Sequence, residues 1–408
     1  MIKKDRQFYR FALYGFLKNL RFFEPFIILI FRENGLTFFQ IGILYSIRDL
    51  TNNLTELPTG FIADAFGRRK SMVFAFIAYI LSFFVFYTFS NFYISAVAMV
   101  LFGLGESFRS GTHKALILEH LKLNDMLDLK VAYYGRTRAA SQMGSAFNSL
   151  IAAALLFFTG DYRTMFLAAT IPYMIDLINL ATYPKILDGE LTQFDRNALW
   201  GQVKATLKDF IGIFRDQHTM RAILNSASFT ALFKSTKDYL QPILEAFALA
   251  LPFLIFVDDV KRSGVVVGIV YFFIYLLTSY ASRSSNEFSR RFKNLTAPIN
   301  LTFLAGVGFL FVAGLSTWQN LTLISILLFL GFYVLQNLRK PMNVAFISDQ
   351  ISHKVMASGL SVEAQFTTIL VAVLAPILGV LADTFGVGIA LTVLGAGTFL
   401  LYSFVKVK

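Results

Sequence analysis

Long apolar stretches recur along the whole chain and are separated by short polar connections. Each stretch holds roughly 20 mostly apolar residues, the length that a helix needs to cross the hydrocarbon core of a bilayer. Helices joined by only a few residues must be antiparallel neighbours, so the pattern predicts a compact all-α membrane bundle. The 12 predicted transmembrane helices fall at about residues 8–31, 37–63, 71–90, 92–118, 131–158, 163–183, 221–247, 263–282, 296–316, 320–346, 356–381 and 387–405.

The composition supports a lipid environment. Of the 408 residues, 56% are hydrophobic and 15% are charged, and the mean hydropathy is +0.61. Soluble domains carry about 25% charged residues. A soluble protein as apolar as this one would expose patches that aggregate. We therefore expect the chain to reside in a lipid bilayer.

The net charge of +12 has two explanations. On a soluble protein, this charge would suggest a nucleic-acid partner. In membrane proteins, however, Lys and Arg collect in the cytoplasmic loops. The second explanation agrees with the apolar stretches, so we expect no nucleic-acid partner.

The sequence gives little support for a metal site or for thiol chemistry. The chain contains no cysteine, which excludes disulfides and thiolate metal sites. Its four histidines are scattered and form no ligand motif, and neither a P-loop nor a nucleophile elbow is present. We expect no metal, no cofactor and no catalytic residue, and therefore not an enzyme.

Basic residues also predict the orientation. One side of the bundle carries the basic N-terminus, Arg68 to Lys70 and the basic residues between 185 and 221, whereas the other side carries few. The basic side should be cytoplasmic, with both termini there. The N-terminus shows no signal-peptide cleavage site, so we interpret it as the start of the first span. The expected location is a bacterial-type inner (plasma) membrane. The few basic residues of the other side are Arg32, Arg163, Lys261 and Arg262.

A polar stretch divides the chain midway. We predict an N-terminal six-helix bundle over residues 1–184, a cytoplasmic linker over 185–219 and a C-terminal six-helix bundle over 220–408. Apolar linker residues at helical spacing predict an amphipathic helix. This helix lies either flat on the membrane surface or against the ends of the bundles. The apolar positions are Leu199, Trp200, Val203, Leu207, Phe210, Ile211 and Phe214.

The two halves share matched segments in the same order. RSGTHKALILEH at 109–120 corresponds to RKPMNVAFISDQ at 339–350, and FGRR at 66–69 corresponds to FSRR at 288–291. The common order indicates a duplication, and six-helix repeats are typical of transporters that bind substrate where the halves meet. Other matched positions are Lys18, Arg21 and Pro25 with Lys234, Lys237 and Pro242, and Gln142 with Gln365.

Residues 60–70, GFIADAFGRRK, lie between the second and third spans. They resemble the cytoplasmic signature of the major facilitator superfamily. The resemblance implies two pseudo-symmetric six-helix bundles around a central cavity and alternating access by rocking of the halves. We expect a monomer. It also implies that the signature stabilises one conformation and does not bind substrate. The matching residues are Gly60, Asp64, Gly67, Arg68, Arg69 and Lys70.

Many ionisable residues fall near the middle of the predicted spans. A charge at a helix centre costs roughly 2.5–3.5 kcal/mol, so these side chains must face one another or water. Asp49, Asn53 and Glu56 follow a single stripe of the second helix, at i, i+4 and i+7. The surplus of basic residues predicts a positive cavity and an anionic or partly anionic substrate. The predicted cavity residues are Lys18, Arg21, Arg48, Asn52, Arg109, Gln142, Lys234, Lys237, Gln241, Tyr271, Tyr275, Arg339 and Gln365.

Acids within the spans are candidate proton sites, since burial and a neighbouring cation shift the pKa of a carboxyl group in opposite directions. We rank Asp49, Glu56 and Glu106 first, ahead of Glu24, Asp238 and Glu363. For Glu106 with Arg109, and for Asp49 with Arg48, a structural ion pair is an equal alternative. Four basic residues are expected instead to reach the head groups at the cytoplasmic border. They are Lys114, Arg136, Arg138 and Lys340.

Three functions remain open. The first is a secondary transporter, coupled to protons, that moves a small polar and anionic solute. The second is a proton-driven drug or toxin efflux antiporter. The third is a membrane receptor on the same scaffold, for which the sequence offers no soluble signalling domain.

Overall fold

The structure is a computed structural model that describes residues 5–191, 217–252, 256–350 and 356–407, together with residue 197 and residues 200–201 and 204–205. All regular elements in these ranges are helices. The N-terminal half contains α1 (Arg6–Leu17), η1 (Glu24–Phe26), α2 (Ile27–Glu33), α3 (Phe38–Phe66), α4 (Arg68–Thr88), α5 (Phe92–Arg109), α6 (Thr112–Leu123), η2 (Leu127–Leu129), α7 (Lys130–Thr159) and α8 (Thr164–Ala181). The C-terminal half follows η3 (Lys185–Asp188) and contains α10 (Gln217–Thr236), η4 (Lys237–Tyr239), α11 (Leu240–Ala250), α12 (Asp259–Ser289), α13 (Thr296–Trp318), α14 (Thr322–Gln350), α15 (Met356–Phe385) and α16 (Val387–Val405).

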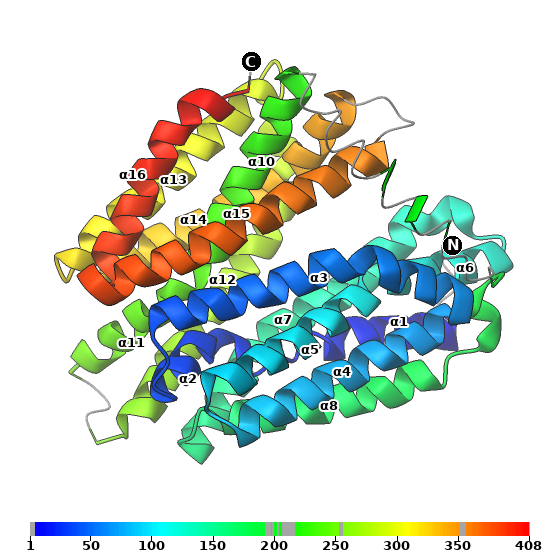
Figure 1. The fold of residues 1–408 in the computed structure, drawn as a ribbon, viewed down its shortest axis with the longest axis horizontal. Helices are drawn as coiled ribbons and strands as arrows, with labels where there is room; N and C mark the ends of the chain where they lie inside the picture. Colours follow the sequence, from blue (N-terminus) through cyan, green and yellow to red (C-terminus); the bar gives the residue numbers. More distant parts are fainter. Residues whose placement is uncertain are drawn as a thin grey trace.

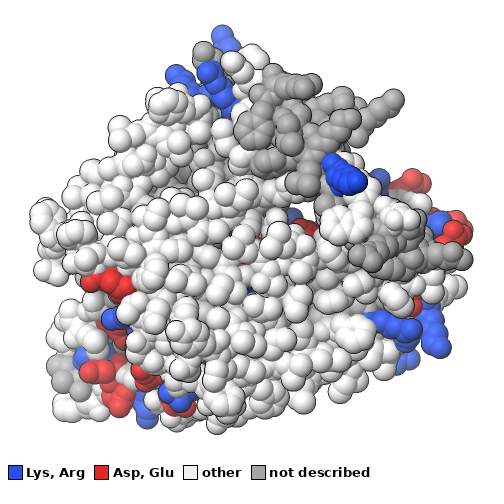
Figure 2. Space-filling view, in the orientation of Figure 1, with Lys and Arg blue, Asp and Glu red and all other residues white. Residues whose placement is uncertain are grey.

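Nine helical segments within the described residues are long and apolar enough to cross a membrane. The other three predicted spans coincide with α3 and with the two interrupted helices, α1–η1–α2 and α10–η4–α11. These three also carry many of the charges noted above. Figure 2 shows charged side chains gathered at the two ends of the molecule, with a broad uncharged surface between them. The protein is an integral, multi-pass membrane protein, and the predicted fold class is confirmed.

Two helix interruptions occur in matching places of the two halves. Pro25 lies in η1, where its ring removes a backbone donor and prevents a regular helix from continuing. Pro242 lies in the first turn of α11, where a proline is tolerated. In both halves the regular α-helix is thus interrupted next to the proline.

A third interruption has no counterpart in the other half. Span four divides into α5 and α6 at Ser110 and Gly111, and Gly111 has φ +71°, a backbone conformation that favours glycine. The matching segment of the other half, α14, continues through Pro341 as one helix. The matched sequences thus fold differently at this point.

The two halves meet along two helix pairs, α3 with α15 and α7 with α12. Figure 1 shows α3 and α15 running side by side between the halves, with both chain termini toward the side where the halves diverge. We call that side the open end, and the opposite side, which carries α2 and α11, the closed end. The architecture is thus two bundles that touch at one end and separate toward the other.

Glycines allow the close contact at the closed end. A Cβ on Gly42 of α3 would lie 2.6 Å from the carbonyl carbon of Ala375 in α15, and a Cβ on Gly268 of α12 would lie 2.8 Å from the carbonyl oxygen of Ser149 in α7. In both helix pairs the backbones approach more closely than a side chain allows.

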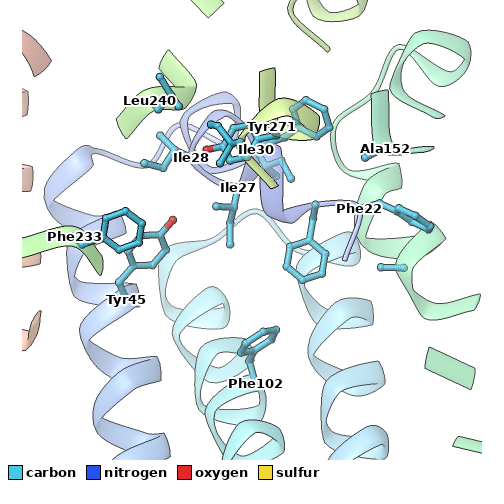
Figure 3. Packing of buried hydrophobic residues seen from close by; sticks show 14 of the residues in the cluster. Phe22, Ile27, Ile28, Ile30, Tyr45, Phe102, Ala152, Phe233, Leu240 and Tyr271 are labelled. Atoms are coloured by element: carbon cyan, nitrogen blue, oxygen red, sulfur yellow. The ribbon is translucent and has the colours of Figure 1, made fainter. Parts of the chain in front are cut away.

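Side chains reinforce this closure. Figure 3 shows Ile27, Ile28 and Ile30 of α2 beside Leu240 and Tyr271 of the other half. Both oxygens of Asp383, at the end of α15, accept from backbone N–H groups at the start of α3, from Phe38 at 2.9 Å and from Phe39 at 2.8 Å. Asp383 is therefore a helix cap supplied by the opposite half.

The linker remains largely a prediction. Residues 185–188 form η3, which packs against α4 and α6 of the N-terminal half. Of the predicted amphipathic positions, Trp200 is exposed. The other six lie outside the described residues, and the boundaries at 184 and 219 stay predictions.

Candidate functional site

A cavity of about 390 Å³ lies between the halves on the open-end side. We call it the interhalf cavity. The second part of α3 and the first part of α10 form two of its walls, and α14 and α15 form the others. Figure 2 shows charged atoms inside a recess between the halves. The polar and charged residues that line it are Asn52, Asn53, Glu56, Ser226, Thr230, Lys234, Gln336, Asn337, Lys340, Asn343, Glu363, Thr367 and Thr368.

A second cavity of about 160 Å³ lies between α7 and α12, also toward the open end. It contains the predicted residues Gln142 and Tyr275, and the hydroxyl of Ser279 donates to Gln142 at 2.8 Å. Asn337 lines this cavity and the interhalf cavity. The two spaces are therefore adjacent.

A third, small cavity of about 30 Å³ lies nearer the closed end and takes residues from both halves. It includes several predicted site residues: Arg21, Glu24, Arg48, Lys237 and Asp238. The structure thus brings together charged residues of the first, second and seventh predicted spans.

Glu106 is held between two guanidinium groups. Arg21 donates to one carboxylate oxygen at 2.5 Å, and Arg109 donates to the other. Arg21 also donates to the Tyr173 hydroxyl at 2.6 Å, and Arg109 to the Tyr79 hydroxyl at 3.0 Å. This network lies entirely within the N-terminal half, which favours the structural interpretation of Glu106.

Asp49 connects the two halves. Its carboxylate pairs with Arg48 of the same helix at 2.8 Å and with Lys234 of α10 at 3.3 Å. Lys237 pairs with its neighbour Asp238 at 2.7 Å. Two of the predicted cavity lysines are thus already engaged by acids.

Glu56 and Glu363 differ from Asp49 and Glu106 because they form no ion pair among the described residues. Ser110 donates to Glu56 at 2.6 Å, and Ser226 donates to Glu363 at 3.0 Å. Both carboxylates line the interhalf cavity. Glu24 also has no ion-pair partner within the described ranges, and it lies in the small cavity.

Arg339 lies away from these cavities. Its side chain is fully buried, donates to the Ile299 carbonyl at 2.6 Å and to Asn225 at 2.7 Å, and stacks over Phe229. All of these partners are neutral and belong to the C-terminal half. The structure therefore places Arg339 inside one bundle and not in the cavity that the sequence pattern predicted.

Four more predicted residues line none of the described cavities: Arg109, whose partners are given above, Gln241, Tyr271 and Gln365. Gln241 is buried at the closed end, where it accepts from the Ile28 N–H at 2.8 Å and donates to the Glu24 carbonyl at 3.1 Å. Tyr271 is buried and meets Tyr333 edge-on. Gln365 is half-buried and lines none of the described cavities.

The signature residues stay within the N-terminal half. Asp64 pairs with Arg68 at 3.3 Å, and Arg68 approaches Glu119 of α6 at 3.9 Å. The Arg69 N–H donates to Asp188 of η3 at 2.7 Å, beside Gly67, whose φ is +105°. None of the cavities described above is lined by residues 60–70, which agrees with a conformational role.

The sequence reasoning missed several residues. Arg138 and Lys340 were expected at the membrane border, yet both line cavities. A usable signal existed, because Arg138, Gln142 and Ser145 follow one face of α7 at i, i+4 and i+7. Asp176 of α8 was also missed. It is fully buried and accepts from Asn179 at 3.0 Å.

Comparisons with known proteins agree with this architecture. The family model described as Major Facilitator Superfamily matches residues 13–362. The chain therefore belongs to the major facilitator superfamily. A search of curated proteins finds no match to the chain.

Several solved structures of transporters have a similar fold. The nucleoside transporter NupG superposes with a TM-score of 0.76 at 13% identity, over 98% of this chain and 98% of the other. A POT family transporter in complex with a thioalcohol-conjugated peptide has a TM-score of 0.72 at 14% identity, over 99% and 97%. A D-xylose–proton symporter has a TM-score of 0.65 at 14% identity, over 98% and 95%. At these identities the likeness shows the fold alone.

Proposed function

We propose that the protein is a secondary transporter that moves a small polar solute with an anionic group across the membrane by alternating access. The observation that carries the proposal is the asymmetry of the interface between the halves. The halves are sealed at the closed end and enclose polar cavities toward the open end. Rocking about the sealed contacts would exchange one accessible side for the other.

The anionic group is suggested by the cations that remain unpaired. Most basic residues near the cavities have acid partners, but Lys18, Arg138 and Lys340 form no ion pair within the described ranges. Each of the three lines a cavity. A substrate with a negative charge would supply the missing partner, whereas a cationic substrate would be repelled.

Proton coupling is the second part of the proposal. Glu56 and Glu363 line the same cavity from opposite halves and carry no fixed cation, so their protonation can respond to substrate and to rocking. They now rank above Asp49 and Glu106, whose charges are engaged by Arg and Lys. Asp238 is likewise engaged, by Lys237, while Glu24 stays a weaker candidate.

The proposed orientation in the membrane rests on the distribution of basic residues along the sequence. With Lys and Arg collected near the termini, we propose that the open end faces the cytoplasm. The proposed unit is a monomer with bundles over residues 1–184 and 220–408, without catalytic activity. The sequence contains no P-loop for ATP, so an ion gradient or the solute gradient supplies the energy.

A flux assay in proteoliposomes tests the proposal. Uptake of labelled small carboxylates, phosphate esters and neutral sugars is measured with and without an imposed pH gradient. We expect flux of an anionic solute that depends on the gradient and falls in Glu56→Gln and Glu363→Gln. Flux of only neutral or cationic compounds contradicts the anionic part, and flux unchanged in both variants contradicts the proton sites.

The efflux alternative is separated by a growth assay. Expression in a host that lacks its own drug exporters should leave the minimal inhibitory concentrations of common toxic compounds unchanged. A several-fold rise that depends on the protein would favour the drug antiporter over the metabolite transporter.

A further inference from the structure

One more cavity lies entirely within the N-terminal half. Its volume is about 230 Å³, and its walls are α1, α6 and α7. We call it the N-half cavity. The chemically important residues of its lining are Tyr14, Lys18, His113, Thr137, Arg138 and Ser141.

The charge of this cavity differs from that of the interhalf cavity. Lys18 and Arg138 line the N-half cavity, and no acidic side chain of the described residues does. The interhalf cavity, in contrast, is lined by two lysines and two glutamates. The positive character that the sequence predicted for the whole central space is therefore concentrated in the N-half cavity.

His113 adds an unused polar group. Its side chain is only 9% exposed, and its Nε2 atom has no hydrogen-bond partner among the described residues. A buried polar atom without a partner costs free energy, so such atoms are rarely left unsatisfied. His113 lines the cavity, so a small turn of its ring would let a ligand or water there bond to Nε2 and remove that cost.

Aromatic contacts hold two of the three groups, His113 and Lys18, in place. The His113 ring stacks on Tyr14 with ring centroids 3.6 Å apart, and the Lys18 ammonium lies 5.2 Å from the centroid of the Tyr14 ring. Phe11 meets His113 edge-on at 5.3 Å. A site whose groups are already oriented loses little entropy when it binds.

We propose that the N-half cavity is an oxyanion site, which binds the carboxylate or phosphate group of the transported solute through Lys18, Arg138 and the His113 ring. Thr137 and Ser141 supply hydroxyl groups on the same wall. The inference rests on the proposed function in one respect, that the bound oxyanion belongs to the transported solute. The site itself requires only the charges and the unsatisfied imidazole.

The location of the site has a mechanistic consequence. All of its residues belong to one half, so the anion travels with that half, and its own contacts need not change as the halves rock. A ligand shifts a conformational equilibrium only through contacts that differ between the states. Arg138 also lines the cavity between α7 and α12, so the rest of the solute would extend there to reach the C-terminal half.

Because the chain contains no cysteine, single reporter cysteines can test the charge of each cavity directly. Ser141→Cys and Tyr134→Cys report on the N-half cavity, and Thr230→Cys reports on the interhalf cavity. Each purified variant reacts with an anionic sulfonatoethyl and a cationic trimethylammonioethyl methanethiosulfonate. We expect the ratio of anionic to cationic labelling rates to be about tenfold higher in the N-half cavity than at Thr230→Cys.

Charge-removing variants identify the residues responsible. Lys18→Gln and Arg138→Gln should each remove most of the preference at both N-half reporters. Lys340→Gln, which removes an unpaired cation of the interhalf cavity, is the matched control and should leave it unchanged. The proposal is overturned if the N-half reporters label with the same ratio as Thr230→Cys, or if Lys340→Gln has the larger effect.

Protection experiments identify the source of the oxyanion. Labelling of Ser141→Cys is measured in phosphatidylcholine nanodiscs with added inorganic phosphate, and separately in nanodiscs that contain phosphatidic acid. Slower labelling with inorganic phosphate supports a soluble anion, and slower labelling with phosphatidic acid alone assigns the same site to a lipid head group. Protection by neither overturns the site. Because no transport is measured, a failed flux assay leaves these outcomes intact, and a failed labelling assay leaves the flux result intact.

Discussion

The same helices form a close contact at one end of the molecule and line cavities toward the other. At the closed end, α3 contacts α15 and α7 contacts α12 so closely that glycines are required on the contact faces. Toward the open end, the same helices carry Asn, Gln, Glu and Arg and leave cavities between them. A helix that carries small, apolar residues in one part and polar residues in another can therefore both close the contact between the halves and line a polar cavity.

The ends also differ in how polar groups are satisfied. Gln241 and Asp383 at the closed end bond to the backbone of the opposite half. At the open end, the carboxylates of Glu56 and Glu363 accept from serines of their own half, and Lys340 has no ion-pair partner among the described residues. The difference indicates that contacts at the closed end stabilise this conformation, while the open end leaves its groups available for the proposed solute and protons.

The largest effect should come from filling the glycine contacts. In Gly42→Val and Gly268→Val the new side chains would overlap backbone of the opposite half, so the closed end cannot form and transport should fall more than about tenfold. A cysteine pair at Phe38 and Tyr239, whose rings lie 5.4 Å apart across the closed end, measures closure by cross-linking. Gly397→Ala is the control, since a Cβ there meets no atom within 4 Å. Undiminished cross-linking in Gly42→Val would contradict the assignment of the closed end.

A buried amide should matter more at the closed end than at the open end. Gln241→Ala leaves the Ile28 N–H and the Glu24 carbonyl without partners, which should lower the free energy of unfolding by about 2–3 kcal/mol. Gln142→Ala removes a half-buried bond to Ser279 and should cost about 1 kcal/mol or less. Thermal unfolding in detergent compares the two variants. Equal losses of stability in the two variants would contradict the expected difference between the closed end and the open end.

The cap from Asp383 should contribute less, but it acts between the halves. Asp383→Ala should cost about 1 kcal/mol, as for other helix caps. Asp258→Ala is the matched control, because Asp258 caps its own helix by accepting from Val260 at 2.9 Å. Both variants should lose similar stability, yet only Asp383→Ala should reduce cross-linking of the Phe38 and Tyr239 cysteine pair. A similar reduction in both variants would contradict the role across the halves.

The smallest effect is expected from the ion pair between Asp49 and Lys234. The Lys234 side chain is 43% exposed, so the pair should contribute less than about 1 kcal/mol. Lys234→Gln should therefore shift the populations of the two conformations only a few-fold, as measured by fluorescence transfer between labels at the open end. Lys237→Gln, which breaks a pair within one half, should leave the populations unchanged. A large shift in the second variant alone would show that the bridge between the halves is irrelevant.

Much of the fold could be predicted because hydrophobic length and proline position act locally. The predicted spans coincide with the helices, and two helix interruptions lie next to Pro25 and Pro242. The break at Ser110 and Gly111 could not be predicted from the repeat, since Lys340 and Pro341 occupy the matching positions and the helix continues through them.

For Arg109 and Arg339, the direction of the side chain could not be predicted from the sequence. Both hold the same position in the repeat, but Glu106 precedes Arg109 by three residues, whereas the equivalent position before Arg339 is Gln336. With an acid on its own helix face, Arg109 forms an ion pair there. Without one, Arg339 turns into its bundle toward Asn225 and the Ile299 carbonyl. Aligning the two repeats predicts how far along its helix a residue lies. It does not predict toward which neighbours a long side chain points.

By itself, the sequence determined that this chain crosses a membrane many times and that charges lie within its spans, and it predicted that the two halves are repeats. These properties depend on composition and spacing along the chain. Only the tertiary structure decided which charges are paired, which cavity is positive and which end is sealed. Those properties depend on contacts between residues such as Asp49 and Lys234, far apart in the chain, whose partners are fixed only when two bundles pack against each other.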